Sequence, residues 1–188
     1  VYNFMHAFYP ANKVTLVSKA LLFAPRLFLK TFQDRPHHYL KKWDELLSAF
    51  EVNAVAASDA HMHMGIYDWS PESYELQMRG VTLYALADEF TDEALVKAIG
   101  EGHSYIVFEA QGRAKAFSFE ANVGHNSYGM GEHVPQGETV KLRVQTDSRA
   151  KIFLMRNGDI VQEVKGKGLE YETNLSGVYR VEVYKGGH

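Results

Sequence analysis

The chain has 188 residues, of which 46% are hydrophobic and 13% are aromatic. This composition is typical of a folded globular protein and excludes a disordered or fibrous one. The 20 basic and 23 acidic residues give a net charge of -3 without a run of five like charges, so the sequence carries no basic patch for nucleic acid or for an anionic membrane. The absence of cysteine excludes disulfides, thiolate metal sites and a cysteine nucleophile, and it leaves the cellular compartment open.

The most apolar stretch, residues 16–32, is interrupted by charged residues and by Pro25. It falls short of the roughly 18 uninterrupted apolar residues of a membrane-spanning helix, so we expect a helix that packs against protein. The chain begins at Val1 without a methionine or a charged segment before an apolar core. No signal peptide is visible, and we expect the natural N-terminus to precede this residue.

Two helices are predicted in the first third of the chain. Apolar residues recur at helical spacing between Val14 and Leu21, and Pro25 is expected to break or kink that helix. Pro36 suits the first turn of the second helix. The apolar positions of this second helix follow at helical spacing: Tyr39, Leu40, Trp43, Leu46, Leu47 and Phe50.

The run at residues 52–57 is short and mostly apolar, and a polar loop begins at Ser58. Such a run is typical of a parallel strand that is buried on both faces. The succession of helix, strand and polar loop is the repeating order of α/β barrels.

A second unit of the same kind follows. Residues 81–86 form a predicted strand, and Thr91 is the expected N-cap of a helix that Gly100 and Gly102 close. Residues 104–109 form the next predicted strand.

The helical period disappears beyond about Arg113, and short apolar runs are separated by turn residues. Asn157-Gly158 predicts a tight hairpin, because both central positions of a type I′ turn need positive φ. In the last strand, Arg180 and Glu182 fall on one face and Val181 on the other. This half is predicted to be all-β.

The sequence therefore predicts a mixed fold. We expect an α/β part over residues 1–111, the C-terminal portion of a TIM-like barrel, and a small antiparallel β-sandwich over residues 112–188.

Asp59 and His61 follow the predicted buried strand in the segment Ser58-Asp59-Ala60-His61. Side chains at this end of a strand point to the place where α/β folds build their sites, and the period of two puts both on the same side of an extended backbone. A carboxylate and an imidazole suit Zn, Mn or Fe. The spacing alone also fits an Asp59 that caps a turn and a His61 on the surface.

The sequence VNAVAASDAH resembles the last metal-binding motif of the PHP (polymerase and histidinol phosphatase) family of metal-dependent hydrolases. Further similarity to its CehA/McbA-like branch covers nearly the whole chain. The segments are VYN, WDELL, VTLYALADEFTDEALVKAIGEGHSYIVFE, LMRNGDIV and LEYETNLSGVYRVEVY.

The resemblance implies a PHP-type barrel with an appended β-sandwich and a metal-activated water that hydrolyses a small-molecule phosphoester, or a related ester or amide. It makes Asp59 and His61 ligands of divalent metal ions. The family's H-x-H motif and its other His and Glu ligands would precede Val1, so the resemblance predicts little hydrolase activity for this chain alone. An open barrel edge would favour oligomers.

The remaining polar candidates are weaker. The family usually has a small or polar residue where this chain has His63, and His103 suits an interaction with a helix C-terminus. The other positions considered are Asn3, His6, His37, His38, His125 and His133.

The sequence lacks a G-x-S-x-G elbow, a P-loop and a G-x-G-x-x-G fingerprint after a strand, which excludes the serine hydrolases and nucleotide-binding folds that carry these motifs. The alternative to the hydrolase is a noncatalytic binding or interaction module that uses the β-sandwich.

Overall fold

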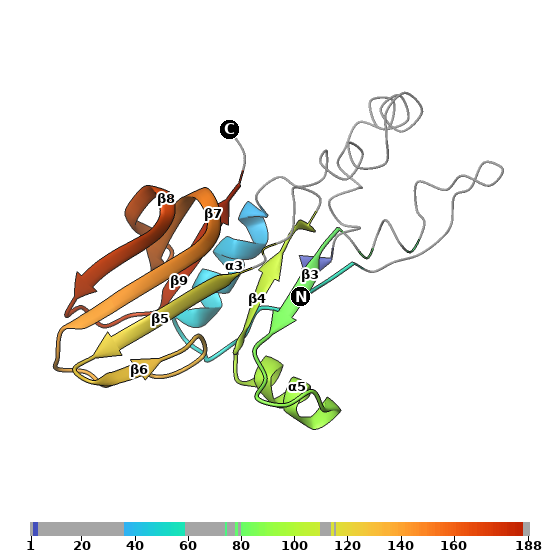
Figure 1. The fold of residues 1–188 in the computed structure, drawn as a ribbon, viewed down its shortest axis with the longest axis horizontal. Helices are drawn as coiled ribbons and strands as arrows, with labels where there is room; N and C mark the ends of the chain where they lie inside the picture. The colour runs from blue at the N-terminus through green and yellow to red at the C-terminus, as the bar shows by residue number, and fades with distance from the viewer. Residues whose placement is uncertain are drawn as a thin grey trace. The chain divides into compact units, whose positions relative to one another are not determined.

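The computed structural model describes residues 2–3, 36–58, 74, 78, 80–109, 114 and 116–185 (Figure 1). The predicted helix at residues 14–21 lies outside these ranges. The chain divides into two compact units, one with residues 1–37, 54–84 and 105–113, the other with residues 38–53, 85–104 and 114–188. The domain boundary expected between residues 111 and 112 stays a prediction.

The first unit contains two separate two-stranded sheets. Strand β1 (Tyr2–Asn3) pairs in parallel with β2 (Ala56–Ala57), with Tyr2 opposite Ala56 and Asn3 opposite Ala57. Strand β3 (Thr82–Ala85) pairs with β4 (Ser104–Val107). Strands β2, β3 and β4 fall within the predicted runs at residues 52–57, 81–86 and 104–109 but are shorter, and β1 was not predicted.

The TIM-like barrel predicted for residues 1–111 is wrong. The described residues form mostly antiparallel sheet with two short helices, α3 (His37–Leu47) and α5 (Asp92–Gly100), and the strands of the first half do not join into one parallel sheet. Within the run at residues 52–57, only Ala56 and Ala57 enter a ladder, and Ala57 is exposed. The fold is all-β-like, and the predicted association through an open barrel edge loses its basis.

The local signals for the two helices are confirmed. Helix α3 begins directly after Pro36. In α5, the Thr91 hydroxyl oxygen accepts a hydrogen bond from the Ala94 N–H at 3.2 Å, which caps the first turn. At the other end, the side-chain amide of Asn53 donates to the carbonyl of Gly100 at 2.6 Å, which satisfies one of the carbonyls that a helix end leaves open.

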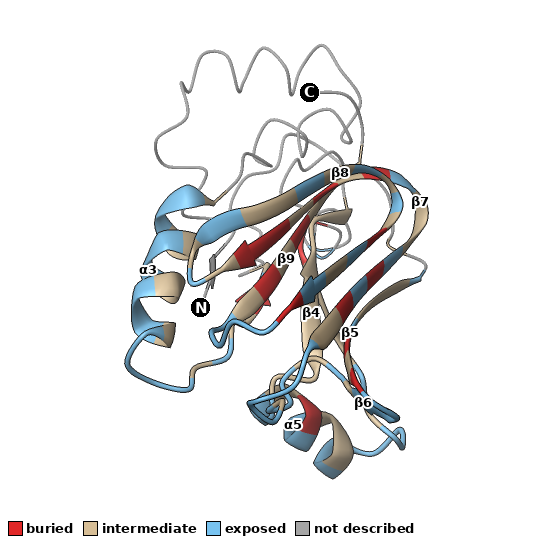
Figure 2. Cartoon of the chain, turned by 90° about the vertical axis from the view of Figure 1, so that its left-hand side faces the viewer, coloured by how far each residue is buried: buried red, intermediate tan, exposed pale blue. Residues whose placement is uncertain are grey.

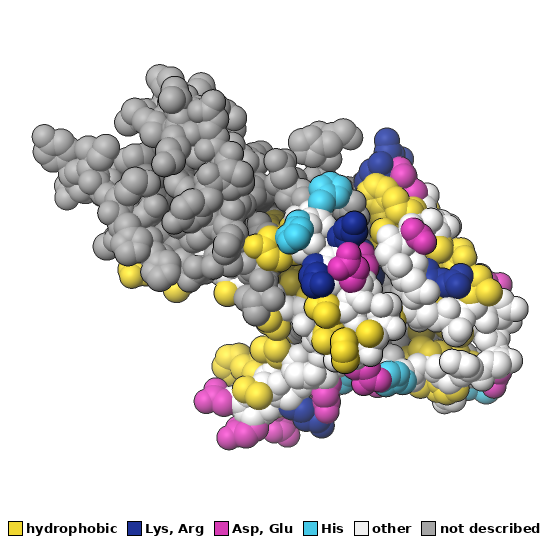
Figure 3. Space-filling view, turned by 180° about the vertical axis from the view of Figure 1, so that it is seen from behind, with side chains coloured by type: hydrophobic (Ala, Val, Ile, Leu, Met, Phe, Trp, Pro, Cys, Tyr) yellow, Lys and Arg dark blue, Asp and Glu magenta, His cyan; other side chains and the backbone are white. Residues whose placement is uncertain are grey.

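Large hydrophobic side chains are exposed around α5. Phe90 is 96% exposed, Val96 is 71% exposed on the helix, and Leu86 is 49% exposed. Figure 3 shows hydrophobic and acidic side chains next to one another in the part of the molecule where Figure 1 places α5.

The second unit is built on one antiparallel sheet of five strands. Its members are β5 (Phe117–Val123), β6 (Asn126–Tyr128), β7 (Val140–Arg156), β8 (Asp159–Thr173) and β9 (Tyr179–Tyr184). The order is β6-β5-β7-β8, and β9 pairs with β7. The predicted antiparallel strands are present, but they form one hydrogen-bonded sheet in place of the two sheets of a sandwich.

Strand β7 belongs to two halves of this sheet, one with β5 and one with β9. Its residues 141–146 pair with β5 and its residues 151–156 pair with β9, while β8 pairs with both stretches. The register between β7 and β8 shifts between Gln145 and Ala150. Such an irregularity bends a strand and increases its twist, and here it separates the β5 half from the β9 half.

The Asn157-Gly158 hairpin turn is confirmed. Asn157 has a φ of 52° and Gly158 a φ of 91°, and the turn joins Arg156 of β7 to Asp159 of β8. Both turn residues adopt the positive φ that a type I′ turn requires.

The core lies on one face of the sheet, toward which every second residue of β7 points. Leu142, Val144, Ile152 and Leu154 of β7 are buried, the last two with no exposed surface, together with Leu169 of β8. Figure 2 shows these buried positions as bands that cross neighbouring strands. The side-chain period of two aligns apolar residues of adjacent strands on this face.

Helix α3 contributes to the cover of the opposite face at β9. Arg180 is only 7% exposed, and its guanidinium donates to both carboxylate oxygens of Asp44, at 2.9 and 2.7 Å. Glu182 accepts from Arg180 and, at 2.8 Å, from the Tyr184 hydroxyl. The ring of Trp43 lies 5.7 Å from the guanidinium carbon. The predicted alternation of β9 is thus confirmed, and its charged face is buried.

Candidate functional sites

The predicted metal ligands Asp59 and His61, as well as His6 and His63, lie outside the described residues. The described chain leads up to them: β2 ends at Ala57, and Ser58 alone separates it from Asp59. Asn3 of β1 is the register partner of Ala57. The segment with the predicted ligands therefore follows, after one residue, the carboxyl end of a strand that is paired in parallel.

The described histidines do not gather into a site. His37, His38, His125 and His133 are exposed. His133 lies 3.4 Å from Glu51 with both side chains more than 80% exposed, and a pair of this kind contributes little to stability.

His103 follows α5, as predicted, with its Nδ1 3.9 Å from the Glu101 carboxylate. Within residues 36–58, 80–109 and 116–185, no three His, Asp or Glu side chains converge as a metal centre would require.

A pair of tyrosines that sequence reasoning did not single out lies on β3 and β4. The rings of Tyr84 and Tyr105 stack with 5.0 Å between centroids and 6° between planes. The Tyr84 hydroxyl donates to Glu109 at 2.6 Å, and burial raises the pKa of the Tyr105 hydroxyl.

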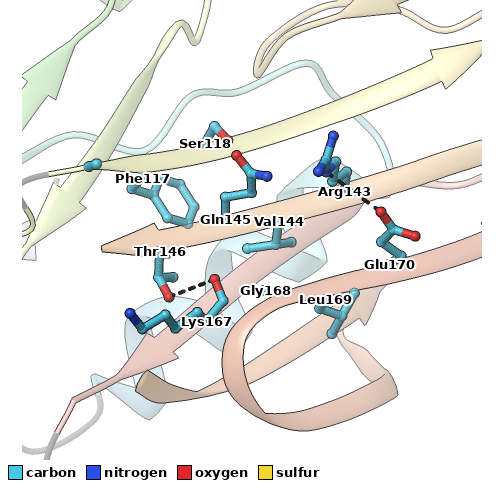
Figure 4. A pocket seen from close by; sticks show the side chains of 11 residues that line it. Phe117, Ser118, Arg143, Val144, Gln145, Thr146, Lys167, Gly168, Leu169 and Glu170 are labelled. Atoms are coloured by element: carbon cyan, nitrogen blue, oxygen red, sulfur yellow. Dashed lines mark hydrogen bonds and ion pairs between the residues drawn. The ribbon is translucent and has the colours of Figure 1, made fainter. Parts of the chain in front are cut away.

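A surface groove of about 620 Å³ crosses β5, β7 and β8 in the second unit (Figure 4). Ser118, Gln145 and Gly168 are directly opposite one another on the three strands and form one row. Arg143 and Glu170 are the β7 and β8 members of the next row on the same face. Val144 and Leu169 point to the other side, into the core.

Gly168 keeps the middle of the groove open. A Cβ atom at this position would lie 2.9 Å from the carbonyl oxygen of Val144, closer than Cβ atoms approach other heavy atoms, so the pairing of β7 with β8 favours glycine here. Because Gly168 has no side chain, β8 does not cover the neighbouring residues Ser118 and Gln145 of this row. A glycine inside a strand is a known sign of close approach, and this was the one signal in the sequence that pointed to the groove.

The charged groups at the groove are interconnected. The Glu170 carboxylate lies 2.9 Å from the Lys141 ammonium and 3.6 Å from the Arg143 guanidinium. The hydrogen bond from Lys141 is the largest of the effects that hold the pKa of Glu170 below its usual range. In the amide orientation that satisfies both groups, the Gln145 oxygen accepts from Arg143 at 3.0 and 3.3 Å.

No protein-family model, curated protein or solved structure matches this chain. In the part of the chain that the structure describes, no helix is long and apolar enough to cross a membrane. The described residues form a mostly antiparallel β fold with a surface groove across β5, β7 and β8.

Proposed function

We propose that the chain acts as part of a metal-dependent hydrolase in which Asp59 and His61 bind a divalent metal ion. One structural observation supports this proposal: β2 pairs in parallel with β1 and ends at Ala57, directly before the Ser58-Asp59-Ala60-His61 segment. The resemblance of the surrounding sequence to PHP hydrolases is the second support.

The donor set fits such an ion. A carboxylate oxygen and an imidazole nitrogen are ligands that Zn, Mn and Fe share, and two residues at positions i and i+2 of an extended backbone project to the same side. A bound divalent ion lowers the pKa of a coordinated water and neutralises charge that develops on the substrate oxygens. The proposed substrate is a small-molecule phosphoester, or a related ester or amide.

Metal binding by the purified chain tests this assignment. We expect Asp59→Ala and His61→Ala each to weaken Mn²⁺ or Zn²⁺ binding, measured by calorimetry, by at least about tenfold, because each removes one of two donors. His125→Ala and His133→Ala are matched controls, since both remove an exposed histidine, and they should leave the affinity unchanged. Equal affinities for all four variants and the unmodified chain would exclude Asp59 and His61 as ligands.

A second candidate function is noncatalytic binding through the antiparallel sheet. The groove across β5, β7 and β8 is the observation that favours it, because the groove is a surface hollow with polar and charged side chains from three strands. The groove residues and the proposed metal ligands are different residues, so the two functions can be tested with separate variants.

A further inference from the structure

We propose that two copies of this chain associate through the free edges of their β8 strands, which pair antiparallel about a two-fold axis at Val164. In this dimer Lys165 of each chain lies opposite Glu163 of the partner subunit. The inference goes beyond the proposed hydrolase and does not depend on whether Asp59 and His61 bind a metal.

Strand β8 is long and lies at the border of its sheet. It has 15 residues and pairs with β7, and Figure 1 shows these two strands side by side in the long hairpin. Among the strands that the structure describes, β7 is its one neighbour. On the free edge of such a strand, backbone N–H and C=O groups point away from the sheet and can pair with another chain. The edge of β8 therefore offers a surface for a further strand.

The charges of β8 are complementary to a second copy of the same strand. Glu163 and Lys165 are both exposed and lie on the same face of the sheet, because the side-chain period is two. Lys165 is directly opposite Lys151 of β7, and Lys151 already pairs with Glu163 at 3.0 Å. Like charges directly opposite each other are destabilising, and among the described residues Lys165 has no ion pair. A carboxylate from a second chain on the other side of Lys165 supplies the missing partner.

The same charges determine the register of the pairing. With Val164 opposite its own copy, both Lys165 side chains lie opposite a Glu163 carboxylate, and Gln162 lies opposite Gly166. A two-fold axis at Glu163 or at Lys165 would instead place that charge directly opposite its own copy. An axis between two residues would put the apolar face of one chain beside the polar face of the other. The axis at Val164 avoids both conflicts.

Sedimentation velocity of the purified chain over a range of concentrations tests this proposal. We expect a reversible equilibrium between monomer and dimer that weakens as salt is added, because the charge pairs lie at the surface. Glu163→Lys and Lys165→Glu should each weaken dimerisation at least about tenfold, because each places two like-charge pairs across the axis. The double variant Glu163→Lys/Lys165→Glu restores opposite charges and should dimerise within about threefold of the unmodified chain. Circular dichroism checks that each variant is folded.

A single introduced cysteine reports the register, because the chain has no cysteine of its own. Oxidation of Val164→Cys should give a covalent dimer, since side chains directly opposite in antiparallel strands have Cβ atoms about 4.5–5.5 Å apart, close to the span of a disulfide. Ile160→Cys is the matched control on the same strand. In this register it lies roughly 26 Å from its own copy and should not cross-link. Lys167→Glu is the charge control, because it lies opposite Val161 and should change dimerisation by less than about threefold.

Four outcomes would overturn the proposal. The first is a chain that stays monomeric at the highest concentration reached, and the second is a double variant that dimerises as weakly as the single variants. The third is Ile160→Cys that cross-links as readily as Val164→Cys. The fourth is growth beyond the dimer, because pairing about a two-fold axis uses the same edge of both copies and closes the assembly.

Discussion

Removal of the Asp44 carboxylate is expected to destabilise the second unit strongly. In Asp44→Ala the buried guanidinium of Arg180 loses two charge-assisted hydrogen bonds, at 2.9 and 2.7 Å. Arg180 is 7% exposed, so water cannot readily replace the lost partner. The helix and β9 are connected through this pair, although 136 residues separate its members in the chain.

The magnitude follows from the burial of the pair. Breaking a buried ion pair by removing one partner costs about 3–5 kcal/mol, because the other charge is left uncompensated. Here Glu182 still compensates Arg180, and the Asp44 side chain is 17% exposed, so we expect a lower cost of about 2–3 kcal/mol. For a chain of this size, that loss corresponds to a decrease in Tm of about 4–12 °C.

Urea unfolding followed by circular dichroism measures this loss. Glu45→Ala is the matched control on the next position of α3, where the Lys42–Glu45 pair is 62% and 52% exposed. The control should change the free energy of unfolding by less than about 0.5 kcal/mol. The triple variant Asp44→Leu/Arg180→Met/Glu182→Gln removes all three buried charges together, leaves an acceptor for the Tyr184 hydroxyl, and should cost less than Asp44→Ala alone. The reasoning is refuted if Asp44→Ala and Glu45→Ala have equal stability, or if the triple variant is the least stable of the three.

Three further outcomes are expected. Gly158→Ala should lose about 1 kcal/mol of unfolding free energy in urea titrations, because φ at this position is 91° and the new Cβ would lie 3.3 Å from Asp44; an unchanged value would contradict the turn assignment. Phe90→Ala should change that free energy by less than about 0.5 kcal/mol, because the side chain is 96% exposed, and a loss above 1 kcal/mol would show that Phe90 packs against protein. Lys141→Gln should raise the pKa of Glu170, measured by carboxyl NMR titration, because the hydrogen bond that lowers it is lost. Since the folded pKa of Glu170 is depressed, its favourable contribution is present above the unfolded pKa and is lost as the pH falls through the folded pKa, and an unchanged titration would show that Lys141 is not the cause.

The sequence predicts features that depend on a few adjacent residues. The Thr91 cap, the Asn157-Gly158 turn and the alternation of β9 are confirmed because each is determined by local backbone geometry and side-chain period. The barrel prediction was wrong because alternating helices and strands do not determine which strands pair. In the structure the same short strands form two separate two-stranded sheets.

Long-range contacts explain what the sequence could not show. The alternation of β9 does not show what covers either face of the strand, and in the structure Asp44 and Trp43 of a distant helix contact Arg180 on its polar face. The groove likewise depends on the register that sets Ser118, Gln145 and Gly168 in one row. The assignment of Asp59 and His61 remains a proposal.

The long β7–β8 hairpin has a consequence for the order of folding. Its pairing starts at Arg156 and Asp159, across a two-residue turn, so the first contacts need the closure of only a very short loop. Pairing can then extend from the turn, past the irregularity between Leu154 and Met155, as far as Ala150, where the second register shift interrupts it. We expect the contacts beyond Gln145 and those with β5 and β9 to form later. Residues near the turn should therefore control the rate of folding, whereas residues of β5 and β9 should chiefly control the rate of unfolding.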